Sequence, residues 1–135
     1  MTVLSLDHVN IRTVSVEETY AFYRDLLGME PRAAPGAKSI DDGGWIYAMD
    51  GKPVVHVRRI GTPDMRGGST PFVAGQGTGP IDHFALKCED YDGVRARLEA
   101  KGVTLNFNDL PQINLRQIFV RDPNDILVEL NFFEA

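Results

Sequence analysis

The chain has 135 residues, of which 43% are hydrophobic and 24% are charged, and its formal net charge is −5. This length suits one globular domain with its own core, and the acidic balance provides no basic stripe to meet the phosphates of a nucleic acid. The single cysteine excludes a disulfide framework, no apolar run approaches the roughly 20 residues that span a bilayer, and the N-terminus does not resemble a signal peptide. We therefore expect a cytoplasmic protein that binds neither nucleic acid nor membrane.

The first half of the chain predicts one helix among four strands. The strands are expected at residues 3–11, 37–42, 44–49 and 53–59. Ser15-Val16-Glu17-Glu18 has the pattern of a capping box, so a helix is expected to begin there. Gly28 is the kind of residue that ends a helix, and Asp50-Gly51-Lys52 is a hairpin signal between the last two strands.

The second half predicts the same order of elements. Its strands are expected at residues 80–88, 103–108, 115–121 and 126–132. Asp90 or Asp92 can cap the intervening helix, which is expected to end at Gly102. The sequence Asp122-Pro123-Asn124-Asp125 predicts a turn between the last two strands.

A glycine- and proline-rich stretch separates the two halves. Residues 61–80 show no periodicity, and an irregular segment of that length is usually functional or a linker. We therefore expect a single domain over residues 1–135, with a first module at 3–60, a linker loop at 61–79 and a second module at 80–133.

The two halves match residue by residue. The matched pairs are His8 with His83, Gly28 with Gly102 and His56 with Glu129, at offsets of 83 − 8 = 75, 102 − 28 = 74 and 129 − 56 = 73. A nearly constant offset indicates a duplicated structural unit. Two of these pairs consist of metal-ligand residue types, and they include every histidine of the chain.

Strand alternation places these four candidate ligands on one kind of surface. His8, His56, His83 and Glu129 all project from the strand face opposite the apolar face that suits helix packing. Glu129 lies within the apolar run 126–130, where a buried carboxylate needs a partner or a metal. Two histidines and a carboxylate with open positions suit Fe(II) and other divalent ions. If the two sheets face each other around a cleft, the four side chains converge on one metal.

Other residues share the strand faces of the candidate ligands. Asn10, Arg58 and Asn131 are candidate substrate contacts, although each also fits an ordinary solvated strand position, and for Arg58 the two interpretations weigh equally. One face of the strand expected at 44–49 carries Trp45, Tyr47 and Met49, a pattern that favours core packing.

Several segments together resemble the vicinal oxygen chelate superfamily. They are Leu6-Asp7-His8-Val9, residues 21–29, Ile81-Asp82-His83-Phe84-Ala85 and residues 119–130. This superfamily includes glyoxalase I, extradiol dioxygenases, methylmalonyl-CoA epimerase, and fosfomycin resistance and bleomycin-binding proteins. The resemblance covers nearly the whole chain. It implies an α+β fold of two βαβββ modules related by a pseudo-twofold axis, which form an open cup around a divalent metal, often in a homodimer.

The resemblance also implies roles for individual residues. His8, His83 and Glu129 match the ligands shared by the enzymatic branches. His56 occupies the place where glyoxalase-type members have a fourth ligand, usually Glu or Gln, whereas extradiol dioxygenases have an acid/base histidine in the equivalent region. Glu129 is similar to the carboxylate that transfers protons in glyoxalase-like lyases and isomerases.

The function expected from these observations is metal-dependent catalysis of the glyoxalase-like lyase or isomerase type. The metal is Zn, Ni, Co, Mn or Fe(II), and the substrate is a small molecule that chelates it through vicinal oxygens. One alternative is an Fe(II) extradiol-type ring-cleaving dioxygenase, and another is a small-molecule binding or resistance protein. We expect a homodimer, in which each metal site is completed either within one chain or by modules of two chains.

Overall fold

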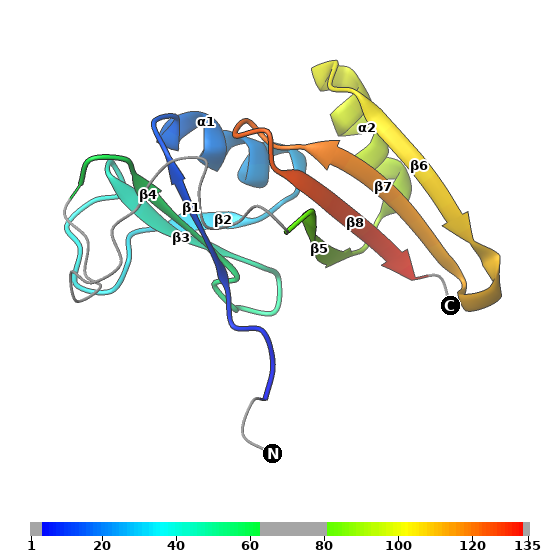
Figure 1. Ribbon diagram of the computed structural model, residues 1–135, viewed down its shortest axis with the longest axis horizontal. Coiled ribbons are helices and arrows are strands. Elements are labelled where there is room, and N and C mark those ends of the chain that lie inside the picture. The colour runs from blue at the N-terminus through cyan, green and yellow to red at the C-terminus, as the bar shows by residue number, and fades with distance from the viewer. Residues whose placement is uncertain (1–3, 63–80, 134–135) are drawn as a thin grey trace. The chain divides into compact units, whose positions relative to one another are not determined.

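The computed structural model describes residues 4–62 and 81–133. Its internal contacts divide the chain into two units, Met1–Thr62 and Pro63–Ala135, and each unit is built on a four-stranded sheet (Figure 1). Both units follow the order βαβββ, so the predicted α+β fold of two such modules is confirmed. Of the linker loop expected at residues 61–79, the part after Thr62 lies outside the described residues.

Unit 1 carries its helix between the first and second strands. Its elements are β1 (Val9–Thr13), α1 (Val16–Ala21), the π-helical turn η1 (Phe22–Leu26), β2 (Glu30–Arg32), β3 (Gly43–Tyr47) and β4 (Val55–Arg59). The sheet order is β1-β4-β3-β2, in which β1 and β4 are parallel and the other pairs are antiparallel. This order places β1 and β4 side by side. These two strands, with His8 directly before β1, carry the candidate residues of unit 1.

The core of unit 1 lies between the helix and one face of the sheet. Ile11, Ile46 and Val55 come from three different strands, and Val16 and Tyr23 come from the helical segment; all five are buried. Because successive strand residues point to opposite faces, the residues between the buried ones project from the other face. That second face carries the candidate site.

The start of α1 differs from the predicted capping box. The Ser15 side chain makes no cap hydrogen bond; instead, the Ser15 backbone N–H donates to Thr13 Oγ1 at 2.8 Å. Glu17, in the first turn of the helix, accepts a hydrogen bond from Arg59 at 2.8 Å. The helical segment does end at Gly28 as predicted, with a φ of 72° that favours glycine.

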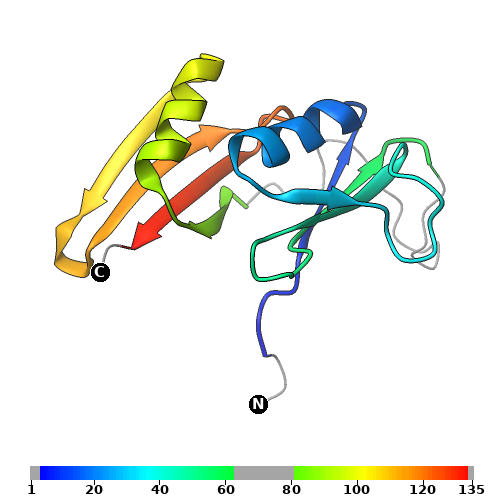
Figure 2. The same cartoon turned by 180° about the vertical axis from the view of Figure 1, so that it is seen from behind.

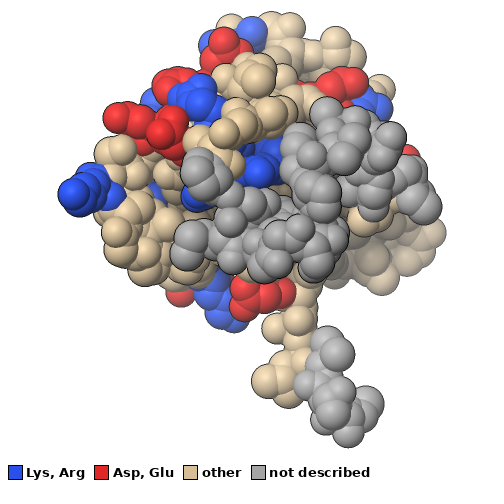
Figure 3. Space-filling view, turned by 60° about the vertical axis from the view of Figure 1, so that its left-hand side comes forward, with Lys and Arg blue, Asp and Glu red and all other residues tan. Residues whose placement is uncertain are grey.

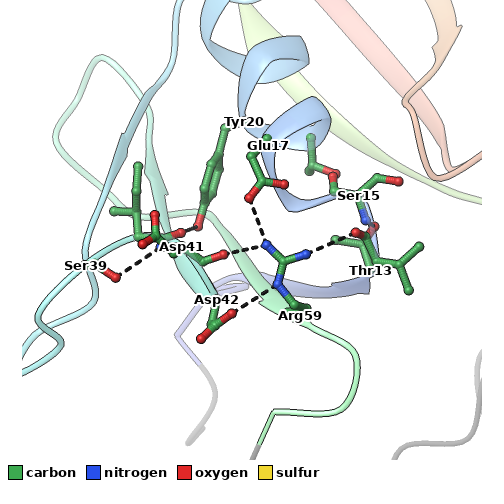
Figure 4. A network of polar contacts seen from close by, with 11 residues as sticks. Thr13, Ser15, Glu17, Tyr20, Ser39, Asp41, Asp42 and Arg59 are labelled. Atoms are coloured by element: carbon green, nitrogen blue, oxygen red, sulfur yellow. Dashed lines mark hydrogen bonds and ion pairs between the residues drawn. The ribbon is translucent and has the colours of Figure 1, made fainter.

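Arg59, the last residue of β4, connects the start of the helix to the loop before β3 (Figure 4). Its guanidinium donates to Glu17, to Asp42, and to the backbone carbonyls of Val14 and Asp41, at 2.7–3.2 Å. The hydrogen bond to Asp42, followed by that to Glu17, raises the pKa of Arg59. A backbone hydrogen bond, followed by the hydrogen bond from Arg59, lowers the pKa of Glu17. Arg59 faces away from the candidate site, so we assign it a structural role.

Unit 2 repeats the architecture with longer strands. Its elements are β5 (His83–Cys88), α2 (Tyr91–Lys101), β6 (Leu105–Leu110), the 3₁₀ turn η2 (Pro111–Ile113), β7 (Leu115–Arg121) and β8 (Leu127–Phe133). The sheet order is β5-β8-β7-β6, with β5 and β8 parallel. As in unit 1, the two parallel strands carry the candidate residues.

Helix α2 lies against one face of this sheet (Figure 2). At its N-terminus the Asp90 side chain accepts from the Gly93 N–H, as the sequence predicted, and at its C-terminus Gly102 has a φ of 79°. Tyr91 contacts Phe132 of β8 edge to face at 5.2 Å, and Arg116 of β7 lies over its ring at 3.5 Å. The opposite face of the sheet therefore carries Glu129 and the residues in line with it.

Two predicted strands of unit 1 are wrong. The first strand was expected at 3–11 but occupies Val9–Thr13, so His8 lies just before it. The strand expected at 37–42 is absent from the described residues, and β2 is the short segment Glu30–Arg32 instead. Pro31 lies within β2, which is at the edge of the sheet, where a proline is compatible with a strand.

No helix in the described part of the chain is both long and apolar enough to cross a membrane. On the face shown in Figure 3, basic side chains lie interspersed with acidic ones rather than gathered in one patch.

Candidate metal centre

Three rings form a stack on the open face of the first sheet. The His8 and His56 rings lie 3.7 Å apart with an interplanar angle of 13°, and Trp45 covers the other side of His56 at 4.3 Å and 8°. Trp45 and His56 are register partners on neighbouring strands. Trp45 is therefore part of the site surface, and the prediction that it packs in the core is wrong; Met49, from the same pattern, is 88% exposed.

Each unit contains an Asp-His pair in which the aspartate holds the histidine. His8 Nδ1 lies 2.6 Å from Asp7 Oδ2, and His83 Nδ1 lies 2.8 Å from Asp82 Oδ2. Metal-binding histidines typically donate one ring N–H to a carboxylate or carbonyl, so that the other nitrogen presents its lone pair to the ion. In both histidines the nitrogen left for an ion is Nε2.

His56 is also oriented with Nε2 as the open nitrogen. Its ring is hydrogen-bonded to the backbone of Pro53, whereas Nε2 is buried without a hydrogen-bond partner in the described structure. Burial, with a smaller contribution from the nearby His8, lowers the pKa of His56. A neutral imidazole with an unsatisfied buried nitrogen is suited to bind a metal or to accept a proton.

Unit 2 brings His83 and Glu129 together. His83 Nε2 lies 3.4 Å from Glu129 Oε1, and the Glu129 side chain is only 15% exposed. The other carboxylate oxygen, Oε2, accepts a hydrogen bond from Asn131 Nδ2 at 2.8 Å. His83 Nε2 and Glu129 Oε1 thus face each other, while Asp82 holds the other nitrogen of His83 and Asn131 holds the other oxygen of Glu129.

The predicted substrate contacts lie near these pairs. Asn10 is the register partner of His56 on β1, and Arg58 projects from the same face of β4, paired in register with Arg12. Asn131 differs from the prediction in its bonding, because both ends of its amide are engaged by other side chains.

The four candidate ligands therefore form two close pairs, one in each unit. Over residues 4–62 and 81–133 no group of three or more His, Cys, Asp or Glu side chains meets. The donor set fits a divalent ion. It consists of three imidazoles and one nearly buried carboxylate, that of Glu129. A carboxylate holds Nδ1 of His8 and of His83, and Nε2 of His56 is buried without a hydrogen-bond partner in the described structure.

The stack limits how His8 and His56 can share an ion. The lone pair of an imidazole nitrogen lies in the plane of its ring, and two nearly parallel planes 3.7 Å apart do not meet at a common ion. Because His56 is enclosed between two rings and His8 is 36% exposed, His8 is the ring that has to turn if both bind.

A hollow of about 670 Å³ opens elsewhere on unit 2, at the end of α2. It is lined by Gly102, Val103, Thr104, Asn106, Phe119, Val120, Arg121 and Leu127. None of the four candidate ligands lines it, although Phe119 is the register partner of Glu129. Leu127, which also lines it, is the register partner of His83, so the hollow adjoins the pair of candidate ligands in unit 2 without containing either of them.

Sequence reasoning missed four residues around the candidate ligands. Asp7 and Asp82 could have been found, because the dipeptide Asp-His occurs at both matched positions. Gln117 and Asn108, which continue the hydrogen-bonded row from Asn131, carry no such signal, because their contacts depend on the register of three strands.

Comparison with known proteins identifies the family. The profile of the Glyoxalase/Bleomycin resistance protein/Dioxygenase superfamily matches residues 5–130. The chain belongs to this superfamily.

Individual relatives of the superfamily are distant. The chain is 26% identical to "Glyoxylase I 4" of Arabidopsis thaliana over 130 residues, which cover 93% of this chain and 69% of that protein. Among solved structures it resembles lactoylglutathione lyase from Agrobacterium tumefaciens, with a TM-score of 0.67, 18% identity, and coverage of 98% of this chain and 96% of that one. It also resembles the fosfomycin resistance protein FosX from Listeria monocytogenes, with a TM-score of 0.65, 15% identity, and coverage of 99% and 97%.

These similarities to solved structures establish the fold. The superfamily includes enzymes, its members commonly depend on a divalent metal and commonly form dimers, and they bind small molecules.

Proposed function

We propose that this protein is a divalent-metal-dependent enzyme of the glyoxalase-like lyase or isomerase type. Its substrate is a small molecule that presents two vicinal oxygens to the metal. His8, His56, His83 and Glu129 are the proposed ligands. The observation that carries the proposal is the repeated arrangement of the histidines, in which Nδ1 of His8 and of His83 is held by the preceding aspartate and Nε2 is left for an ion.

A divalent ion bound there supplies Lewis-acid chemistry, which polarises a substrate carbonyl and stabilises the oxyanion that forms on proton removal. Glu129 is the proposed base, since it is the one carboxylate in this group that is nearly buried. Oε1 is the oxygen that takes the proton once it has left the metal or exchanged with the substrate, because Oε2 already accepts from Asn131. Asn10 and Arg58, on the same strand faces as the histidines of unit 1, are the proposed substrate contacts.

The ring stack favours a second candidate, an Fe(II) extradiol-type dioxygenase. In that reading His8, His83 and Glu129 hold the ion, and His56 remains in the stack as an acid or base. The nearly parallel His8 and His56 rings are compatible with this division of roles without any rotation.

Metal analysis of protein purified under low oxygen tests the proposal and separates the candidates. We expect one divalent ion per chain in the wild-type protein, and loss of that ion in His83→Ala with an unchanged circular dichroism spectrum. Isomerase or lyase activity with Zn, Ni, Co or Mn supports the first candidate, whereas Fe(II) with oxygen uptake on catechols supports the second. A folded His83→Ala protein with full metal content would refute the metal centre.

A further inference from the structure

Three side-chain amides form a continuous row that ends on Glu129. Asn108 Nδ2 on β6 donates to Gln117 Oε1 on β7 at 2.8 Å. Gln117 Nε2 donates to Asn131 Oδ1 on β8 at 3.0 Å, and Asn131 Nδ2 donates to Glu129 Oε2 at 2.8 Å. The row crosses three adjacent strands of one sheet, because these residues are register partners or near neighbours on the same face.

The direction of every bond in this row follows from the carboxylate. An ionised carboxylate only accepts hydrogen bonds, so Asn131 must turn its NH₂ group toward Glu129. Its carbonyl oxygen then faces Gln117, which must present its own NH₂ group, and the same condition applies to Asn108. All three amide dipoles therefore point the same way, an arrangement in which each bond strengthens the next.

The fold itself does not require these amides. The position of unit 1 that matches Asn131 is Arg58, at an offset of 131 − 58 = 73. The register partner of Asn131 is Gln117, whereas the register partner of Arg58 is Gly43. Unit 1 nevertheless forms a sheet of the same strand order. The amide row is thus particular to the sheet that carries the carboxylate.

We propose that Asn131, supported by Gln117 and Asn108, is a positioning residue for Glu129 rather than a substrate contact. By holding Oε2, the row leaves Oε1 as the oxygen that faces His83 Nε2, 3.4 Å away. Glu129 would then offer a divalent ion one oxygen rather than two. Gln117 is 8% exposed, so it acts on the site only through Asn131. This inference rests on the proposed metal centre.

Cobalt binding tests the row independently of any substrate. Metal-free wild-type, Asn131→Leu and Gln117→Leu proteins are titrated with Co²⁺, and affinity is measured by competition with a chelator while the visible absorption spectrum is recorded. We expect Asn131→Leu to bind Co²⁺ about 10- to 100-fold more weakly, the usual effect of losing a partner that orients a metal ligand. We expect a smaller loss in Gln117→Leu, and an altered spectrum in both, because the released carboxylate can bind through both oxygens.

Asn106→Leu is the matched control. Asn106 lies on β6 two residues before Asn108, on the same sheet face, and pairs in register with Phe119; its replacement should leave the affinity and the spectrum unchanged. Circular dichroism and thermal unfolding of the metal-free proteins show whether each variant folds. If Asn131→Leu does not fold, Gln117→Leu carries the test, since the Gln117 side chain is hydrogen-bonded to Asn108 and Asn131 rather than to Glu129.

The outcomes separate the two proposals. A wild-type protein that binds Co²⁺, with folded Asn131→Leu and Gln117→Leu proteins of the same affinity and spectrum, overturns the positioning role and leaves the metal centre intact. A wild-type protein that binds no divalent ion overturns both. A loss of affinity in both variants, with Asn106→Leu unaffected, supports the row.

Discussion

His56 is the candidate ligand whose role depends most on local geometry. Its ring lies between His8 and Trp45, so phenylalanine at this position keeps a stacked ring but removes both nitrogens. If His56 is a ligand, His56→Phe should bind Zn²⁺ at least about 10-fold more weakly while its stability without metal stays within about 1 kcal/mol of wild type. Chelator competition and chemical unfolding measure the two quantities.

The contrary result would assign His56 to proton transfer. In that case His56→Phe retains full metal affinity and loses turnover. Its open Nε2 and its lowered pKa fit that role as well, because a neutral imidazole is able to accept a proton.

Cys88, the one cysteine of the chain, gives a prediction that does not depend on any metal. Burial raises the pKa of its thiol from 9.0 to about 11, and its Sγ lies 3.6 Å from the Leu86 carbonyl oxygen. At pH 8 the thiolate fraction is then about 100-fold lower than in the unfolded chain. A disulfide reagent should therefore label the native protein at least that much more slowly than the urea-denatured protein; equal rates would contradict the burial.

Sequence reasoning identified the candidate ligands better than their surroundings. His8, His56, His83 and Glu129 could be proposed as ligands because their residue types and repeat offsets can be read along the chain. The amide partners of Glu129 could not be found in this way, because the contacts between β6, β7 and β8 follow from strand register.

At the scale of elements, the strands of the second sheet were predicted more accurately than those of the first. The strand expected at 115–121 is β7, and that expected at 126–132 differs from β8 by one residue at each end. Each of these strands has seven residues, enough for a largely apolar segment between turn signals to be recognised. In unit 1, β2 has three residues including Pro31, and too short a strand leaves no pattern to detect.

Helix α1 is fastened to the following loop by a tyrosine. Tyr20 donates through its hydroxyl to the Ile40 carbonyl at 2.8 Å (Figure 4). Tyr20→Phe removes this bond and should lower the free energy of unfolding by about 0.5–1.5 kcal/mol at pH 7. Urea unfolding followed by circular dichroism measures the difference.

The pH dependence of the same variant supplies a control. Burial raises the pKa of Tyr20 from 10.0 to about 12. A raised folded-state pKa contributes stability that is fully present below pH 10 and is lost as the pH rises toward 12. The advantage of wild type over Tyr20→Phe should therefore shrink between pH 10 and pH 12, and a constant difference would contradict a buried, hydrogen-bonded hydroxyl.

At the scale of the whole molecule, the division of the ligands between two units governs assembly. Unit 1 holds His8 and His56, and unit 2 holds His83 and Glu129, so neither unit completes the proposed site. The apolar residue before each Asp-His pair is also exposed, Leu6 at 80% and Ile81 at 69%. A symmetric dimer can use such matched positions, one from each unit.

We therefore expect a homodimer as the working unit, which sedimentation at micromolar concentration measures. Two arrangements are open to it: units of one chain complete each site, or units of two chains do so.

An equal mixture of His8→Ala and Glu129→Ala chains, unfolded and refolded together, distinguishes these two arrangements. If two chains share each site, half of the dimers are mixed and each mixed dimer contains one site with all four ligands, so about a quarter of all sites should bind metal at wild-type affinity. If each site belongs to one chain, no site in the mixture is intact and the metal content should equal that of the separate variants. A monomer that binds metal at full occupancy would refute the dimer as the working unit.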